Sequence, residues 1–169
     1  MISAHLQKAI ETLKIHDVYV RDQVATCMNG FNPKYAPDIE TLTVQHMHLV
    51  QQSSVVEVDE TNCLLQVFIR LGVRWVDSTE ENEDLSVKAM IEGEFITEYA
   101  MNEKLDQQII DEFALKNASY HVWPYWRELL SNHCTRMHLP RLILPTVQFA
   151  QNQQQLEKTD SDSNVGENP

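Results

Sequence analysis

One stretch decides the fold: Cys63-Leu-Leu-Gln-Val-Phe-Ile-Arg-Leu-Gly-Val-Arg-Trp75. Every second residue from Cys63 to Trp75 is apolar, and the residues between them are mixed and include Gln66, Arg70 and Arg74. A period of two is that of a β-strand, whose successive side chains point to opposite sides of a sheet. The stretch therefore predicts a long strand with one buried face and one mixed face.

Three further strands are predicted on either side of this one. Residues 14–24 are rich in β-branched side chains, residues 39–50 form a second extended run, and residues 85–98 alternate apolar and polar positions. A crossover loop with two prolines, Asn29–Pro37, separates the first two strands, since proline cannot donate to a central ladder. The direct connections favour a largely antiparallel meander.

Helical spacing dominates the remaining parts of the chain. Residues 2–13 predict a short amphipathic helix, and a longer helical region is expected from Asn102, a plausible N-cap. Pro124 is expected to break or restart this region. The inward positions predicted there are Leu105, Ile109, Ile110, Phe113, Ala114, Leu129, Leu130 and Cys134. The predicted class is α+β: a four-stranded antiparallel sheet packed with a long, Pro-broken C-terminal helical layer.

Composition narrows the class of protein. The chain has 169 residues, enough for one domain, and its 13 Lys and Arg against 25 Asp and Glu give a net charge of −12. Nucleic acid and anionic membranes are excluded as partners because both need clustered basic side chains. No apolar run reaches a membrane span, and the first residues do not resemble a secretory signal. Three distant cysteines, Cys27, Cys63 and Cys134, indicate a reduced, cytoplasmic protein.

The sequence motifs that would indicate catalysis or metal binding are absent or incomplete. The chain has no GxSxG, Gly-rich phosphate loop or HExxH motif. Cys134 and His138 lie four residues apart on a predicted helix, yet a buried cysteine on an apolar face explains Cys134 without a nucleophile. His46 and His48 share one strand face and need a third ligand to hold zinc. We expect no enzyme activity, metal or cofactor; a metal- or Cys/His-dependent enzyme on the same fold is the alternative.

Aromatic and methionine side chains gather in the crossover loop and around Pro124. They are Met28, Phe31, Tyr35, Trp123, Tyr125 and Trp126. Such side chains can repack around many different sequences, so together they indicate a groove that recognises apolar polypeptide. The alternative is that these aromatic residues close the edge of the core, and the pattern alone favours that alternative.

Two blocks near the C-terminus resemble the end of the SecB family of export chaperones. They are Trp123-Pro-Tyr-Trp-Arg-Glu-Leu-Leu-Ser131 and Arg136-Met-His-Leu-Pro-Arg-Leu-Ile-Leu-Pro-Thr-Val-Gln-Phe149. The family carries a Pro-Tyr-x-Arg-Glu helix and then a Pro-x-Leu-x-Leu-x-Pro-Val-x-Phe-like segment. The matching residues, with the second proline allowed a shift of one place, are Pro124, Tyr125, Arg127, Glu128, Pro140, Leu142, Leu144, Pro145, Val147 and Phe149. Weaker matches occur in the family's order at Val18–Asp22, Tyr35–Ile39 and Glu92–Phe95.

The resemblance implies an ATP-independent cytoplasmic holdase that binds unfolded preproteins in apolar grooves between the crossover loop and the helical layer. It also implies a homotetramer, built as a dimer of dimers that pack through their helices. The best candidates for the client groove are Phe31, Tyr35, Ile39, Phe95, Trp123, Tyr125 and Trp126. A net charge of −12 would keep such an apolar surface in solution.

Two departures concern the SecA motor, the family's export partner. Asp22 matches an acidic docking residue of the family's first strand, whereas Ser86 and Lys88 stand where the family has Leu and Glu. Lys in place of Glu reverses the charge offered to a basic partner. A SecB-like chaperone dedicated to one client, such as an antitoxin, is therefore an alternative outside the export route. A scaffold that binds one folded partner is a third.

The chain divides into three predicted parts. Residues 1–14 form an N-terminal helical extension, and residues 15–149 form the SecB-like chaperone domain. Residues 150–169 form an acidic, polar tail in place of the family's C-terminal helix. We expect this tail to be disordered, because it lacks the apolar side chains that a core requires.

Overall fold

The stretch that predicts a long strand is strand β3, Cys63–Val76, in the computed structural model of the chain. The structure describes residues 2–60 and 62–144. From Leu65 to Trp75 the alternate side chains are at most 2% exposed. The predicted buried face is therefore confirmed.

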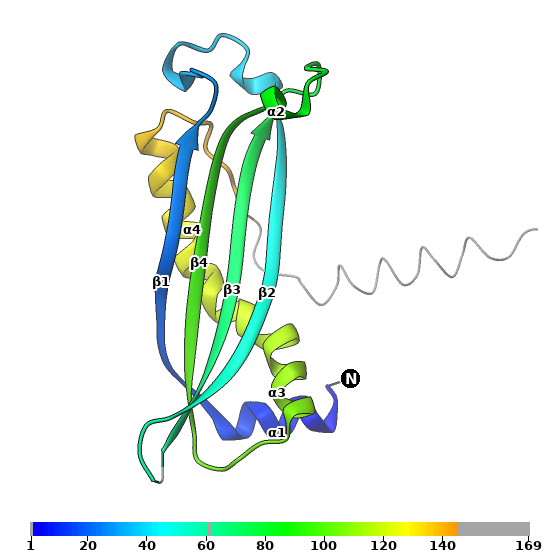
Figure 1. Cartoon of the computed structure of the whole chain (residues 1–169), viewed down its shortest axis with the longest axis vertical. Coiled ribbons are helices and arrows are strands. Elements are labelled where there is room, and N and C mark those ends of the chain that lie inside the picture. Colours follow the sequence, from blue (N-terminus) through cyan, green and yellow to red (C-terminus); the bar gives the residue numbers. More distant parts are fainter. Residues whose placement is uncertain (1, 61, 145–169) are drawn as a thin grey trace, which may run out of the picture.

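The sheet has four strands, in the order β1-β4-β3-β2. The other three are β1 (Leu13–Cys27), β2 (Thr43–Glu57) and β4 (Val87–Met101), and every neighbouring pair is antiparallel. Strands β2, β3 and β4 form the predicted meander, but β1 lies beside β4, at the opposite edge from β2 (Figure 1). The crossover loop therefore carries the chain across one end of the sheet, through the 3-10 turns Pro33–Tyr35 and Ile39–Thr41.

The predicted helix start at Asn102 is wrong. Alternate burial continues along β4 through Tyr99 and Met101, so the strand uses the residues that were assigned to the connection. Helix α3 begins only at Gln107 and ends at Phe113, with Asp106 at its N-cap. A short helix, α2 (Glu83–Ser86), connects β3 to β4.

The helical layer is not broken at Pro124. Helix α3 leads into a π-helical segment, Ala114–Ala118, and then into α4, Ser119–Arg136, which contains Pro124 in its interior. A proline there removes one backbone hydrogen bond. Burial of the face of α4 that includes Val122 and Trp126 against the sheet offsets that loss.

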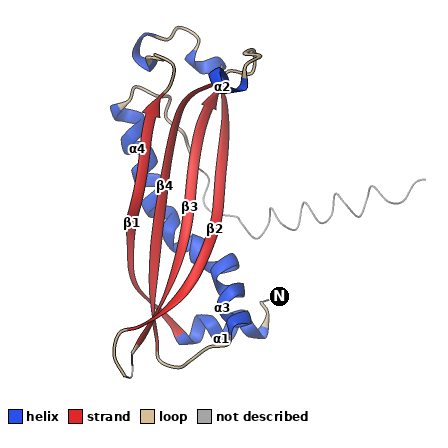
Figure 2. Cartoon of the chain, in the orientation of Figure 1, coloured by secondary structure: helices blue, strands red, loops and turns tan. Residues whose placement is uncertain are grey.

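The core lies between the sheet and the α3–α4 layer, which crosses one face of the sheet diagonally (Figure 2). All eight of the predicted inward positions of this layer are buried: Leu105, Ile109, Ile110, Phe113, Ala114, Leu129, Leu130 and Cys134. Helix α1, Ala4–Thr12, confirms the predicted N-terminal helix and packs against α3. Its N-cap Ser3 also donates a 2.6 Å hydrogen bond to Glu112 of α3.

The opposite face of the sheet carries the mixed side chains, and none of the helices in residues 2–60 and 62–144 lies over it (Figure 2). The Arg70 guanidinium lies 2.8 Å from the Glu92 carboxylate, and that of Arg21 lies 3.3 Å from Glu94. Arg21 also lies over the Phe68 ring, 5.7 Å from its centre. We refer to this side as the open face. Within the described residues, no helix is both long enough and apolar enough to cross a membrane.

Candidate functional site

The crossover loop presents one aromatic side chain to solvent and anchors two apolar side chains against the core. Tyr35 is 74% exposed, while Phe31 and Ile39 are partly buried against the core. The Asn32 side chain accepts a hydrogen bond of 3.2 Å from the backbone N–H of Lys34, which starts the turn that carries Tyr35. The loop therefore holds Tyr35 outward at the end of the sheet.

The aromatic side chains predicted on α4 and β4 separate into two groups. Tyr125 is 49% exposed and Trp123 is partly buried, so both are accessible from outside. Trp126 and Phe95 are 2% and 0% exposed, and their rings pack edge to face with centroids 6.4 Å apart. Their prediction as groove residues is corrected here, because side chains enclosed between sheet and helix cannot contact a client.

Other apolar side chains on the helical side are exposed although the sequence analysis did not select them. They are Leu115, Tyr120 and Ile143, which are 61%, 37% and 88% exposed. Ile143 lies between Leu142 and Leu144 in the family-like motif, and the alternation of that motif was a signal that could have found it. The predicted helical stripe did not include Leu115 or Tyr120.

A groove lies between α4 and the extended segment that follows it. Its volume is about 340 Å³. Its lining includes residues from both motif blocks: Pro124, Arg127, Glu128, Ser131, Arg141, Leu142, Ile143 and Leu144. Folding therefore brings the two blocks together along one side of α4. We call this feature the helix groove.

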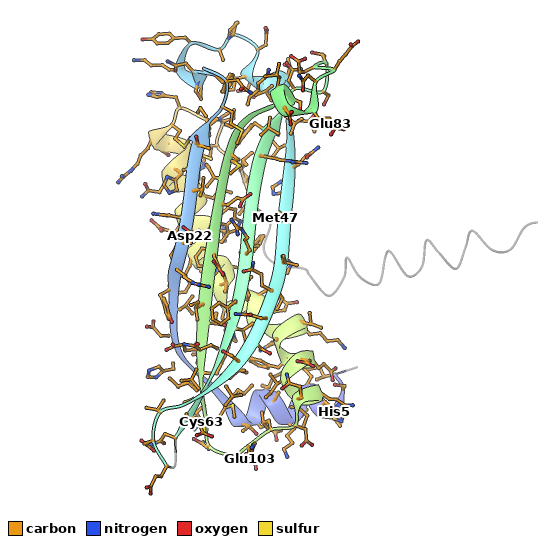
Figure 3. The ribbon with its side chains drawn as sticks, in the orientation of Figure 1. His5, Asp22, Met47, Cys63, Glu83 and Glu103 are labelled. Atoms are coloured by element: carbon orange, nitrogen blue, oxygen red, sulfur yellow. The ribbon has the colours of Figure 1, made fainter. Side chains whose placement is uncertain are left out.

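The three positions considered for SecA docking do not lie together. Asp22 is exposed on the open face of β1 and is paired in register with Glu94 (Figure 3). Ser86 and Lys88 lie at the α2 end of β4, and six residues of strand separate Lys88 from Glu94, roughly 20 Å. The Lys88 ammonium lies 3.8 Å from the Asp77 carboxylate. Asp22 therefore has no basic or acidic neighbour from the Ser86–Lys88 segment.

The cysteine and histidine side chains that were considered for catalysis or metal binding lie where a structural role explains them. Cys134 is 2% exposed, and burial raises the pKa of its thiol to about 11, the opposite of what a thiolate nucleophile needs. His138 is exposed at the end of α4. The His48 ring lies 2.7 Å from the Ser119 hydroxyl, and burial lowers the pKa of His48. In residues 2–60 and 62–144, no three His, Cys, Asp or Glu side chains are grouped to hold a metal.

Part of the predicted motif lies outside the described residues. This applies to Pro145, Val147 and Phe149, and to the predicted tail, residues 150–169.

Comparison with known proteins identifies the fold. No family model and no curated protein matches the sequence. Among solved structures, the chain is similar to the SecB-like chaperone Rv1957 of Mycobacterium tuberculosis, in complex with a ChAD peptide from the Rv1956 HigA1 antitoxin. The TM-score is 0.60 at 19% identity, over 85% of this chain and 94% of that chain. A Streptococcus agalactiae protein of unknown function matches with a TM-score of 0.39 and 11% identity, over 79% of this chain and 96% of that chain.

The chain therefore has a SecB-like fold, in a divergent form. The four-stranded antiparallel sheet and the long C-terminal helix predicted from the sequence are confirmed at this level.

Proposed function

We propose that this protein is an ATP-independent holdase chaperone, which binds unfolded polypeptide segments and keeps them from aggregating. The observation that carries the proposal is the SecB-like fold, because Rv1957, which shares it, is a SecB-like chaperone solved with an antitoxin peptide. Burial of apolar client side chains can supply the binding free energy without nucleotide hydrolysis.

The proposed client surface combines the crossover loop with the outside of the helical layer. Its members are Phe31, Tyr35, Ile39, Trp123 and Tyr125, and Phe95 and Trp126 support it from the core. Exposed aromatic and aliphatic side chains of this kind mark binding surfaces when they form a contiguous patch. We further propose a cytoplasmic homotetramer, a dimer of dimers, because several such surfaces in one assembly would increase avidity for a long unfolded chain.

A chaperone dedicated to one client is the second candidate. It is favoured over general export by the antitoxin peptide bound to Rv1957 and by the separation of Lys88 from Asp22. The two roles differ in their partner. An export chaperone would bind purified SecA through Asp22, and Asp22→Asn would weaken that binding. A dedicated chaperone would bind one antitoxin-like segment much more tightly than other unfolded chains, and would not bind SecA.

The holdase proposal is tested by light scattering from a chemically denatured protein diluted into buffer without nucleotide. We expect the chain to suppress aggregation, and Tyr35→Ser and Tyr125→Ser to raise the concentration needed roughly fivefold or more, because each removes an exposed ring. Tyr19→Ser is the matched control, since Tyr19 is 37% exposed but lies on the open face. Unchanged aggregation in the presence of the wild-type chain would contradict the proposal.

The enzyme alternative makes a different prediction in the same samples. A metal- or Cys/His-dependent enzyme would contain stoichiometric zinc or lose its activity on Cys134→Ala, and would not suppress aggregation. The raised pKa of Cys134 argues against the thiol version.

A further inference from the structure

The two edge strands of the sheet differ in how they are protected against pairing. Edge strands expose backbone N–H and C=O groups, and proteins usually protect them with charged side chains, proline or bulges. Strand β1 carries Lys14, Asp17, Arg21 and Asp22 and has two register shifts. Residues 43–56 of β2 contain no Asp, Glu, Lys, Arg or Pro. Apart from one register shift, between Val50 and Gln52, β2 lacks these protections, so its outer edge is open to a further strand.

Exposed apolar side chains accompany this unprotected edge. Leu49, Val55 and Val56 are 49%, 45% and 40% exposed, and Val58 immediately beyond the strand is 59% exposed. In the sheet of the described residues, β2 has β3 as its one neighbour. An added strand would thus gain main-chain hydrogen bonds together with apolar contacts on both sides of the sheet.

Two cavities are lined in part by side chains of β2, and both extend from it over neighbouring elements. One, of about 290 Å³, is lined by Gln45, His46 and Met47 of β2 together with Gly72 and Glu92. Gly72 lets the Met47 side chain pack closely over β3, because a Cβ atom at this position would lie 3.0 Å from the Met47 methyl group. The other, of about 640 Å³, is lined by Val55, Glu57 and Cys63, and also by residues 101–105 of the β4–α3 connection.

The two cavities are far apart along one strand. In Figure 3, Cys63 marks the end of the sheet where the larger cavity lies, and Met47 lies well along β2 from it. The eight residues from Met47 to Val55 span roughly 26 Å in a strand. An extended segment of about ten residues would therefore reach from one cavity to the other and could place a side chain in each.

We propose that the outer edge of β2 binds an extended segment of client polypeptide, which joins the sheet antiparallel or parallel as a fifth strand. The inference rests on the proposed holdase function and assigns a second binding surface to it, apart from the crossover loop and α4. Main-chain hydrogen bonds do not depend on sequence, and an edge without charges does not select for client charge. Both properties suit a protein that accepts many unfolded chains.

A second copy of this chain is a poorer occupant than a flexible segment. Two β2 strands related by a twofold axis would use the full edge only if the axis passed near the middle of the strand. The register shift between Val50 and Gln52 lies there, and a bulge bends and twists the strand locally. In a pairing of two β2 strands, each copy would bring its own bulge, and two rigid copies cannot adjust to each other. An unfolded segment can follow the bend.

The inference is tested by amide hydrogen exchange of the full chain, followed by NMR, with reduced and alkylated α-lactalbumin as a permanently unfolded client. On client binding, we expect alternate amides of β2 to become protected, because alternate N–H groups of an edge strand point outward. The amides of β1 are expected to change little. Client binding without protection in β2 overturns the inference and leaves the holdase proposal standing, whereas absence of client binding overturns both.

A matched pair of variants tests the same surface by affinity. Leu49→Lys places a charge on the β2 edge, and Ile15→Lys places one on the β1 edge, where Ile15 is 52% exposed. We expect Leu49→Lys to weaken client binding at least about tenfold and Ile15→Lys to change it little. Melting temperatures confirm that both variants fold. Equal effects of the two variants overturn the inference, as does a fall in molecular mass for Leu49→Lys, which would show that β2 joins two copies.

Discussion

The two faces of the sheet use the same central strands and have opposite chemistry. On the helix-covered face, Phe95 and Tyr99 of β4 are 0% and 1% exposed and contact Trp126 and Phe113 edge to face. On the open face, β4 carries the acids Glu92, Glu94 and Glu98, which bind Arg70, Arg21 and Gln66. The apolar face is thus already occupied by the protein's own helices. The client surfaces proposed above therefore lie elsewhere, on the crossover loop, outside α4 and along β2.

The largest difference in stability between the two faces is expected when one phenylalanine on each face is replaced by alanine. Phe95→Ala should lower the free energy of unfolding by about 3–5 kcal/mol, because it leaves a cavity between sheet and helix. Phe68 is 9% exposed on the open face, and Phe68→Ala should cost less, about 1–3 kcal/mol. Urea denaturation of both variants measures the difference. Equal losses would indicate that another subunit covers the open face.

A smaller effect is expected in the pH dependence of the free energy of unfolding, to which two histidines of the helix-covered face contribute. His48 and His121 face Ser119 and Tyr99, and burial lowers the pKa of both rings below the ordinary 6.5. Below about pH 6.5 the unfolded chain therefore binds protons that the folded chain does not. The free energy of unfolding should fall as the pH drops from about 7 to about 5.

Denaturation of the double variant His48→Gln, His121→Gln across this range should show a weaker slope. The carboxylates of Asp77 and Glu112 do not interfere, because their pKa values are lowered, from 3.8 and 4.5. The stability they contribute is lost only as the pH falls below those values. An unchanged slope in the double variant would assign the pH dependence to other groups.

The smallest effect is expected from the ion pairs of the open face. Arg70 and Glu92 are 33% and 24% exposed in their side chains, so solvent screens their attraction. A double-mutant cycle with Arg70→Met and Glu92→Gln should give a coupling free energy below about 1 kcal/mol, and added salt should reduce it further. A coupling of several kcal/mol would mean that the pair is desolvated, as it would be under a bound partner.

The strands were predictable because their signal is local. Alternation from Cys63 to Trp75 placed β3 within one residue of its end, since burial on one face imposes a period of two on the sequence itself. The helix start was missed because Asn102 has the chemistry of an N-cap, while the burial of Met101 that extends β4 depends on contacts with distant residues. Pro124 was misjudged for a similar reason: its cost is local, but the packing that offsets it is tertiary.

The sequence predicted which residues belong to the candidate site, but it did not predict which of their side chains are exposed. The aromatic residues of the crossover loop and those around Pro124 in α4 were identified, and Tyr120 was missed. Trp123, Tyr125 and Trp126 lie within four positions of each other and differ widely in burial. Which of them faces out depends on the phase of α4 against the sheet. A π-helical segment directly before α4 shifts that phase, and the residue spacing carries no sign of it.

The sequence alone was enough to assign the α+β fold class. It established four strands and a C-terminal helical region, a net charge of −12, and a SecB-like motif at the C-terminus. The positions of β1 and β2 at the two edges are evident only in the folded chain, because strand order follows from the crossover and from side-chain burial between elements distant in sequence. The same contacts decided that Phe95 and Trp126 support the proposed client surface from within instead of forming it.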